Sequence, residues 1–138
     1  MKQLMFLILI MIVLPLNAND LTIQSNELST LEFDCKKNVI CEEKKVDIIA
    51  SIIMQQIQLN WSKKQSERNL TAKIHLSLNN NGEIKLLEFD QPSADAIYDE
   101  SLLLAINNAF PIKEIHFINP ALFNEHLKEI YISFGVTN

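Results

Sequence analysis

Residues 70–90 read LTAKIHLSLNNNGEIKLLEFD, and this stretch decides the fold. Apolar and polar residues alternate over residues 70–78, the period of two expected when one face of a sheet is buried and the other is in water. Residues 79–82, Asn-Asn-Asn-Gly, tolerate the positive φ angles of a tight turn. Residues 83–90 resume an extended pattern with shifted apolar positions, which indicates a β-bulge. The stretch therefore predicts a β-hairpin.

A helix is predicted before the hairpin. Its apolar residues recur at three- and four-residue steps, as one face of an α-helix requires. They are Val46, Ile49, Ala50, Ile53, Ile57 and Trp61. A second apolar strip at Ile48, Ile52 and Leu59 indicates that the helix packs against more than the sheet. Trp61 continues the main strip, so we expect it to close the core rather than to act as a binding hot spot.

A second helix is predicted after the hairpin, over residues 98–109. Its continuous apolar face consists of Tyr98, Leu102, Ala105, Ile106 and Ala109. The two alanines would let this helix lie close to a sheet. Pro111 cannot continue a helix and moves Phe110 away from helical angles, so the helix must end there.

The last strand follows a long connection at residues 112–126. Asn119 and Pro120 resemble an N-cap followed by a proline at the first helical position, which predicts one short helical turn over residues 120–125. Residues 130–136 then alternate again and predict a final strand. The order helix, strand, strand, helix, strand predicts an α+β fold, a small three-stranded antiparallel sheet with two helices packed on one face.

Residues 1–18 match the pattern of an export signal. Lys2 gives a short basic start, residues 4–16 form an apolar run, and Ala18 is a small residue suitable for cleavage. The run is too short to span a bilayer comfortably, because a spanning helix needs about 20 residues. We therefore expect cleavage after about Ala18 and a periplasmic location. The alternative is an uncleaved segment that anchors the protein to the inner membrane.

Residues 19–45 are polar and lack a sustained period, so we expect an N-terminal extension before a domain of residues 46–138. Cys35 and Cys41 are the only cysteines. An oxidising compartment favours their pairing, which predicts a disulfide that closes a small loop. Two thiolates without further ligands at a suitable spacing do not make a zinc site.

The composition excludes several classes of function. Without Lys2, 11 basic residues stand against 17 acidic ones, a net charge of −6. Nucleic-acid binding is therefore disfavoured, because it depends mainly on Lys and Arg that neutralise phosphates. With only two glycines there is no glycine-rich phosphate cradle, and the three histidines lack metal-ligand spacing. We expect no cofactor, no metal and no small-molecule substrate.

Two groups of residues are candidate catalytic sites. Asp95, Asp99 and Glu100 form the densest acidic group, but acidic residues in a first helical turn more simply favour the helix dipole. His75 and Ser77 lie two apart on one strand face without a third orienting group, so His75 is expected to be a solvated surface residue. The sequence therefore predicts no catalytic residue and no enzymatic activity.

Four motifs connect the chain with a known family. They are IQLNW at residues 57–61, NGEI at residues 81–84, DESLLLAINNAFP at residues 99–111 and FNEHLKEIYISF at residues 123–134. In this order and spacing the chain resembles the C-terminal domain of the TolA and TonB cell-envelope proteins, and TolA more than TonB. TolA-like proteins also carry a membrane anchor with polar residues and a long periplasmic rod. Residues 4–16 contain no polar residue and no rod precedes the domain, so energy transduction is not expected.

The resemblance implies a non-catalytic binding module. Such domains bind partners by strand addition, in which an extended peptide pairs with an exposed sheet edge. The expected receiving strand contains Glu129, Ile130, Tyr131, Ile132, Ser133 and Phe134. The expected partners are Tol-Pal components, outer-membrane proteins, or bacteriocin or phage segments. The alternative is a periplasmic inhibitor or accessory subunit of a soluble enzyme.

Overall fold

The computed structural model describes residues 8–10, 39–61 and 70–135. It contains one sheet with the strand order β1-β4-β2-β3. The strands are β1 (Ile8–Ile10), β2 (Thr71–Leu78), β3 (Ile84–Gln91) and β4 (Glu129–Gly135). β2 pairs with β3 and with β4 in antiparallel fashion, so the three predicted strands and their hairpin are confirmed. The hairpin carries register shifts at Lys73/Ile74 and Ser77/Leu78, which account for the shift in its apolar pattern.

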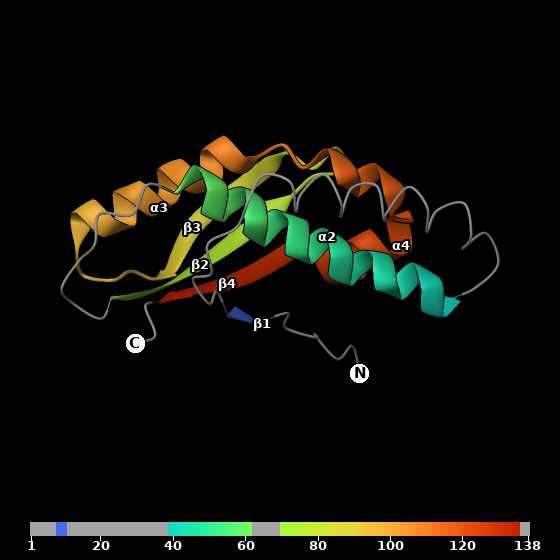
Figure 1. Ribbon diagram of the computed structural model, residues 1–138, viewed down its shortest axis with the longest axis horizontal. Coiled ribbons are helices and arrows are strands. Elements are labelled where there is room, and N and C mark those ends of the chain that lie inside the picture. Colours follow the sequence, from blue (N-terminus) through green and yellow to red (C-terminus); the bar gives the residue numbers. More distant parts are fainter. Residues whose placement is uncertain (1–7, 11–38, 62–69, 136–138) are drawn as a thin grey trace.

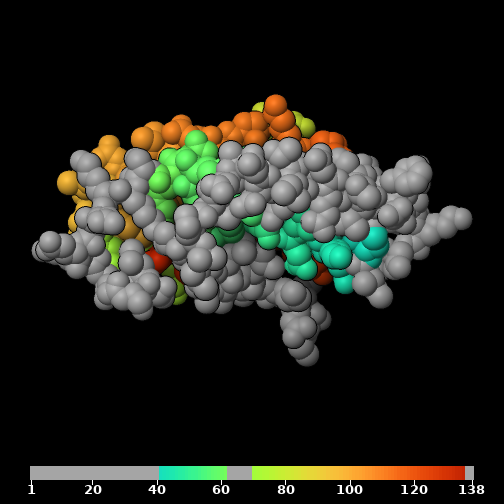
Figure 2. Space-filling model, in the orientation of Figure 1, coloured from blue at the N-terminus to red at the C-terminus, as the bar shows by residue number. Residues whose placement is uncertain are grey.

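The helices cover one face of this sheet (Figure 1). They are α2 (Val39–Asn60) and α3 (Ala96–Ala109), with the short elements η1 (Lys113–Phe117), α4 (Pro120–Leu122) and η2 (Phe123–Leu127) in the long connection. In the space-filling view from the same side, atoms of α2 are visible across the middle and atoms of α3 at the upper left (Figure 2). The α+β architecture agrees with the prediction.

The first helix begins earlier than predicted. α2 starts at Val39, three residues before Glu42, where acidic residues suited to the positive end of the helix dipole predict the start of the helix. Lys45 explains part of the difference, because its side chain is buried and its Nζ lies 2.8 Å from Glu42 Oε1 and 3.3 Å from the carbonyl oxygen of Phe117. A buried ammonium group needs such partners. These contacts join the first turns of α2 to η1, a relation between distant segments that the local pattern does not contain.

The core lies between the helices and the sheet. α3 buries Leu102, Ala105, Ile106 and Ala109, four of the five residues of its predicted face, and α2 buries Ile49, Ile53 and Ile57. Trp61 joins the layers, with its ring centroid 5.5 Å from that of Tyr98 and 5.8 Å from that of Phe134. Its Nε1 donates to Ser101 Oγ at 3.0 Å. The expectation that Trp61 closes the core is confirmed.

The hairpin turn fits closely against the connection after α3. Gly82 has a φ of +76°, and a Cβ atom there would lie 2.1 Å from the carbonyl oxygen of Ile112. The backbone N–H of Ile112 donates to the carbonyl of Gly82 at 3.0 Å. A side chain at this position meets both a left-handed backbone and a backbone oxygen, so glycine is required.

The predicted export signal lies largely outside the described residues. Its residues 8–10 are described, and they form β1 along the outer side of β4. No helix in the described ranges is both long and apolar enough to cross a membrane.

Candidate functional site: the outer edge of β4

β4 divides the six predicted partner-binding residues between two faces of the sheet. Ile130, Ile132 and Phe134 are each about 1% exposed and belong to the core under the helices. Glu129, Tyr131 and Ser133 alternate with them and lie on the face opposite α2 and α3, which we call the open face. A peptide added to β4 would therefore reach the core residues only through their backbone, whereas the open-face side chains are exposed or half-buried.

The outer side of β4 already pairs with a strand. β1 runs parallel to β4, with Ile8 opposite Tyr131, Leu9 opposite Ile132 and Ile10 opposite Ser133. The ladder covers three of the seven residues of β4. In the part of the chain that the structure describes, β4 is therefore not the terminal strand of the sheet that the sequence led us to expect. Its outer N–H and C=O groups are the kind of template that accepts another strand.

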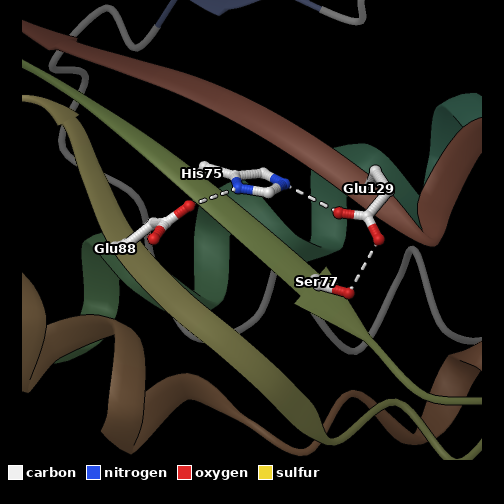
Figure 3. A network of polar contacts seen from close by, with 4 residues as sticks. All are labelled: His75, Ser77, Glu88 and Glu129. Carbon is white, nitrogen blue, oxygen red and sulfur yellow. Dashed lines mark hydrogen bonds and ion pairs between the residues drawn. The ribbon is translucent and has the colours of Figure 1, made fainter.

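His75 lies at the centre of a polar cluster on the open face, next to β4 (Figure 3). Its Nδ1 is 3.0 Å from Glu88 Oε1 on β3, and its Nε2 is 2.7 Å from Glu129 Oε2 on β4. Ser77 Oγ donates to the other oxygen of Glu129 at 2.9 Å. The ring also stacks on Tyr131, with centroids 4.5 Å apart and planes inclined by 8°. The cluster therefore connects three strands.

The expectation that His75 is an ordinary solvated residue was wrong. Its side chain is 17% exposed, and both ring nitrogens have carboxylate neighbours. The register explains the arrangement, because His75 lies opposite Glu88 on one side and opposite Tyr131 on the other. The signal in the sequence was a histidine in the middle of a strand, but its neighbours depend on pairings across the sheet that local alternation does not specify.

The cluster changes the proton affinities of two of its members. The hydrogen bond to Glu88 raises the pKa of His75 above its ordinary value, against the effect of desolvation, and the contacts with Glu129 add to the rise. Burial raises the pKa of Glu129, but hydrogen bonds from His75 and Ser77 and nearby positive charge outweigh it and hold this pKa below its ordinary value. Both shifts favour the ion pair.

The acidic group in α3 has a structural role. Asp95 is the N-cap, and its Oδ1 accepts from the backbone N–H groups of Ile97 and Tyr98, both at 3.0 Å. Asp99 accepts from the backbone N–H of Ser93 at 3.1 Å. The Asp95 bonds satisfy donors that a helix start leaves without partners. The Asp99 bond holds the turn that precedes the helix.

No group of three or more His, Cys, Asp or Glu side chains among the described residues could hold a metal ion. In the open-face cluster the two carboxylates lie on opposite sides of the His75 ring and do not converge on one point (Figure 3). Cys41 lies in the first turns of α2, whereas Cys35 is outside the described residues. The Cys35–Cys41 disulfide therefore stays a prediction.

The family assignment follows from the sequence match. The profile of the family described as TonB C terminal matches residues 50–130, more than half of the 138 residues. The chain belongs to the TonB C-terminal family. The match extends from the middle of α2 to the second residue of β4, so most of β4 lies beyond it.

A solved structure supports the fold of this TonB C-terminal domain. It is the solution NMR structure of TolAIII bound to a peptide derived from the N-terminus of TolB. The two chains share 20% sequence identity, the TM-score is 0.56, and the match covers 64% of this chain and 72% of TolAIII. At this identity the likeness establishes the TolA-like fold alone. A search of curated proteins found no match.

Proposed function

We propose that this protein is a non-catalytic, periplasmic interaction module of the cell envelope that binds partners by strand addition along β4. Domains of the TonB C-terminal family are typically non-catalytic and periplasmic, which supports the general class. The observation that carries the specific proposal is the parallel pairing of residues 8–10 with Tyr131, Ile132 and Ser133. An extended segment fits along this edge, and main-chain hydrogen bonds are what strand addition requires.

Processing of the leader fits the same proposal. Cleavage after Ala18 would remove β1, which is the strand that pairs with the outer side of β4 in the described chain. The mature protein would then present the backbone groups of β4 together with the open-face side chains of Glu129, Tyr131 and Ser133. A partner strand would direct alternate residues to the open face and to the opposite face, which the helices cover.

The proposed partners are envelope proteins. TolAIII in the similar structure is bound to a TolB-derived peptide, which supports Tol-Pal components as the first candidates. Outer-membrane proteins and bacteriocin or phage segments remain in the proposal on the basis of the family resemblance. The net charge of −5 for the whole chain opposes nucleic acid as a partner.

The proposal is tested with the mature protein, exported and purified from the periplasm. A peptide from the N-terminus of TolB is titrated into the isotope-labelled protein, and backbone amide shifts are followed. We expect the largest shifts at residues 129–134 and small shifts in β3, the opposite edge of the sheet. Saturable binding that shifts β3 and leaves residues 129–134 unchanged would place the binding edge elsewhere.

Affinity capture from intact envelopes separates the two classes of function. Recovery of Tol-Pal or outer-membrane proteins with the tagged mature chain supports the interaction module. Recovery of one soluble enzyme, followed by a change in its activity on reconstitution, would favour the inhibitor or accessory subunit instead. A charge substitution at the β4 edge, Ser133→Glu, serves as the control and is expected to reduce recovery of genuine edge-binding partners.

A further inference from the structure

We infer that the protonation state of His75 regulates strand addition at β4: the imidazolium form secures the receiving strand, and partner affinity falls when the ring becomes neutral. The inference rests on the proposed function and concerns the control of the same edge. It is carried by the geometry of the open-face cluster of His75, Ser77, Glu88, Glu129 and Tyr131 (Figure 3).

The geometry selects the charged form of the ring. Both nitrogens lie within hydrogen-bond distance of a carboxylate oxygen, 3.0 Å for Glu88 and 2.7 Å for Glu129. A carboxylate can only accept, and a neutral imidazole has one N–H and one lone pair. Only the imidazolium donates to both carboxylates. In the neutral ring a lone pair faces one of the two carboxylates, and that contact becomes repulsive.

The β4 members of the cluster are open-face residues of the receiving strand. Glu129 is the first residue of β4, and its contacts with His75 and Ser77 direct its carboxylate toward β2 and away from the outer edge. Tyr131 lies opposite His75 in the register and carries the stacked ring. His75 therefore orders two of the three side chains beside which an added strand would lie.

The His75 ring is less exposed to solvent than its two carboxylate partners, which strengthens the interaction of its charge with them. The His75 side chain is 17% exposed, whereas Glu88 and Glu129 are 56% and 48% exposed. The ring is shielded from water more than its partners, so its charge interacts more strongly with them than it would on a free surface. Loss of this charge leaves two carboxylates beside a neutral ring and weakens the ordering of β4. A less ordered receiving strand costs more conformational entropy to bind.

Several other charged or titratable groups lie near the ring. Among the described residues they are Glu88 on β3, Glu129 and Tyr131 on β4, and Lys73 two residues away on the same strand, with Lys128 next to Glu129. A transition at this site is therefore assigned to His75 only where it coincides with the NMR titration of the His75 ring protons.

The test measures the affinity of the mature protein for the TolB N-terminal peptide between pH 5.5 and 8.5. We expect the Kd to rise about two- to fivefold across this interval, the range that corresponds to one cross-strand contact. Its midpoint should coincide with the NMR titration of the His75 ring protons. His75→Gln should show no such rise. His126→Gln, a histidine on η2, is the matched control and should keep the wild-type profile.

A second variant and a second readout make the result independent of the peptide. Glu88→Gln removes the first carboxylate partner without changing β4, so the midpoint should move to lower pH while binding persists. In the free protein, hydrogen exchange of the β4 amides, corrected for intrinsic rates, should accelerate above the His75 midpoint and stay level in His75→Gln.

The outcomes separate the two proposals. If the peptide binds at the β4 edge with the same Kd at every pH, this inference is wrong and the proposed function stands. If the peptide binds nowhere along β4 at any pH, the proposed function fails, and the regulation of strand addition fails with it. A profile that follows His126 rather than His75 also overturns the inference.

Discussion

The two faces of the sheet differ in the residues that they carry and in the contacts that those residues make. On the covered face, alternate residues of β2 and β4 such as Ile74, Ile132 and Phe134 are apolar and at most 1% exposed, and the helices pack against them. On the open face, His75 and Glu129 are polar and hold one another across strands. Burial of the covered face requires only that apolar residues alternate along each strand. The polar contacts of the open face require particular residues opposite one another on neighbouring strands. The covered face supplies stability, and the open face carries the proposed regulation of strand addition.

The largest expected effect is a difference in the free energy of unfolding between substitutions at two neighbouring residues of β4. Ile132→Ala on the covered face removes buried apolar volume and should lower the free energy of unfolding by about 2–5 kcal/mol. Ser133→Ala on the open face should change it by less than about 0.5 kcal/mol. Chemical denaturation of both variants measures the difference. Equal losses for the two variants would mean that the faces do not differ as described.

A smaller effect is expected where the hairpin turn meets the connection after α3. Gly82→Ala introduces a Cβ atom 2.1 Å from the Ile112 carbonyl oxygen at a φ of +76°. The combined strain should lower the free energy of unfolding by about 1–3 kcal/mol. Asn81→Ala, one residue earlier in the turn, is the control for a change that meets no backbone oxygen. A melting temperature for Gly82→Ala equal to that of Asn81→Ala would contradict the close approach.

The smallest expected effect is the pH dependence of stability from the open face. The folded-state pKa of His75 is raised above its ordinary value of 6.5, so its stabilisation is fully present below pH 6.5 and is lost as the pH rises through the folded-state pKa. The pKa of Glu129 is lowered from 4.5, so its stabilisation is present above pH 4.5 and is lost as the pH falls through the folded-state pKa. The pair should contribute most between these two values.

Urea unfolding of wild-type protein and of His75→Gln across pH 5 to 9 checks this dependence. The difference in the free energy of unfolding should be greatest near pH 5 to 6 and should decrease at alkaline pH. A difference that stays constant or grows with pH has the wrong sign for a raised histidine pKa. Salt should reduce the difference, because both carboxylates reach the solvent.

Much of the fold could be predicted because the patterns that specify its helices and strands each lie within a short stretch of sequence. The alternation of residues 70–78 and the helical spacing of Leu102, Ala105 and Ile106 each lie within one element, and burial follows from them. The Asn119–Pro120 N-cap was equally readable, and Asn119 Oδ1 does accept from the backbone N–H groups of Ala121 and Leu122. Such signals depend on neighbours a few residues away in the chain.

The site was less predictable because the residues that form it are far apart in the sequence. His75 and Glu129 are 54 residues apart in the sequence, and a shift of one residue in the register would place them on opposite faces. The pairing of β1 with β4 joins residues at opposite ends of the chain, and the apolar composition of residues 4–16 predicted a leader without predicting that contact. The family match, which ends at residue 130, adds little about the residues beyond it.

The contact between Trp61 and Phe134 has a practical consequence. Trp61 is the only tryptophan in the chain, and its ring lies edge-on to a core residue of β4. A partner that pairs with β4 as proposed is therefore expected to alter the emission of this single fluorophore through Phe134. Titration of the unlabelled protein with peptides that lack tryptophan would measure that change directly.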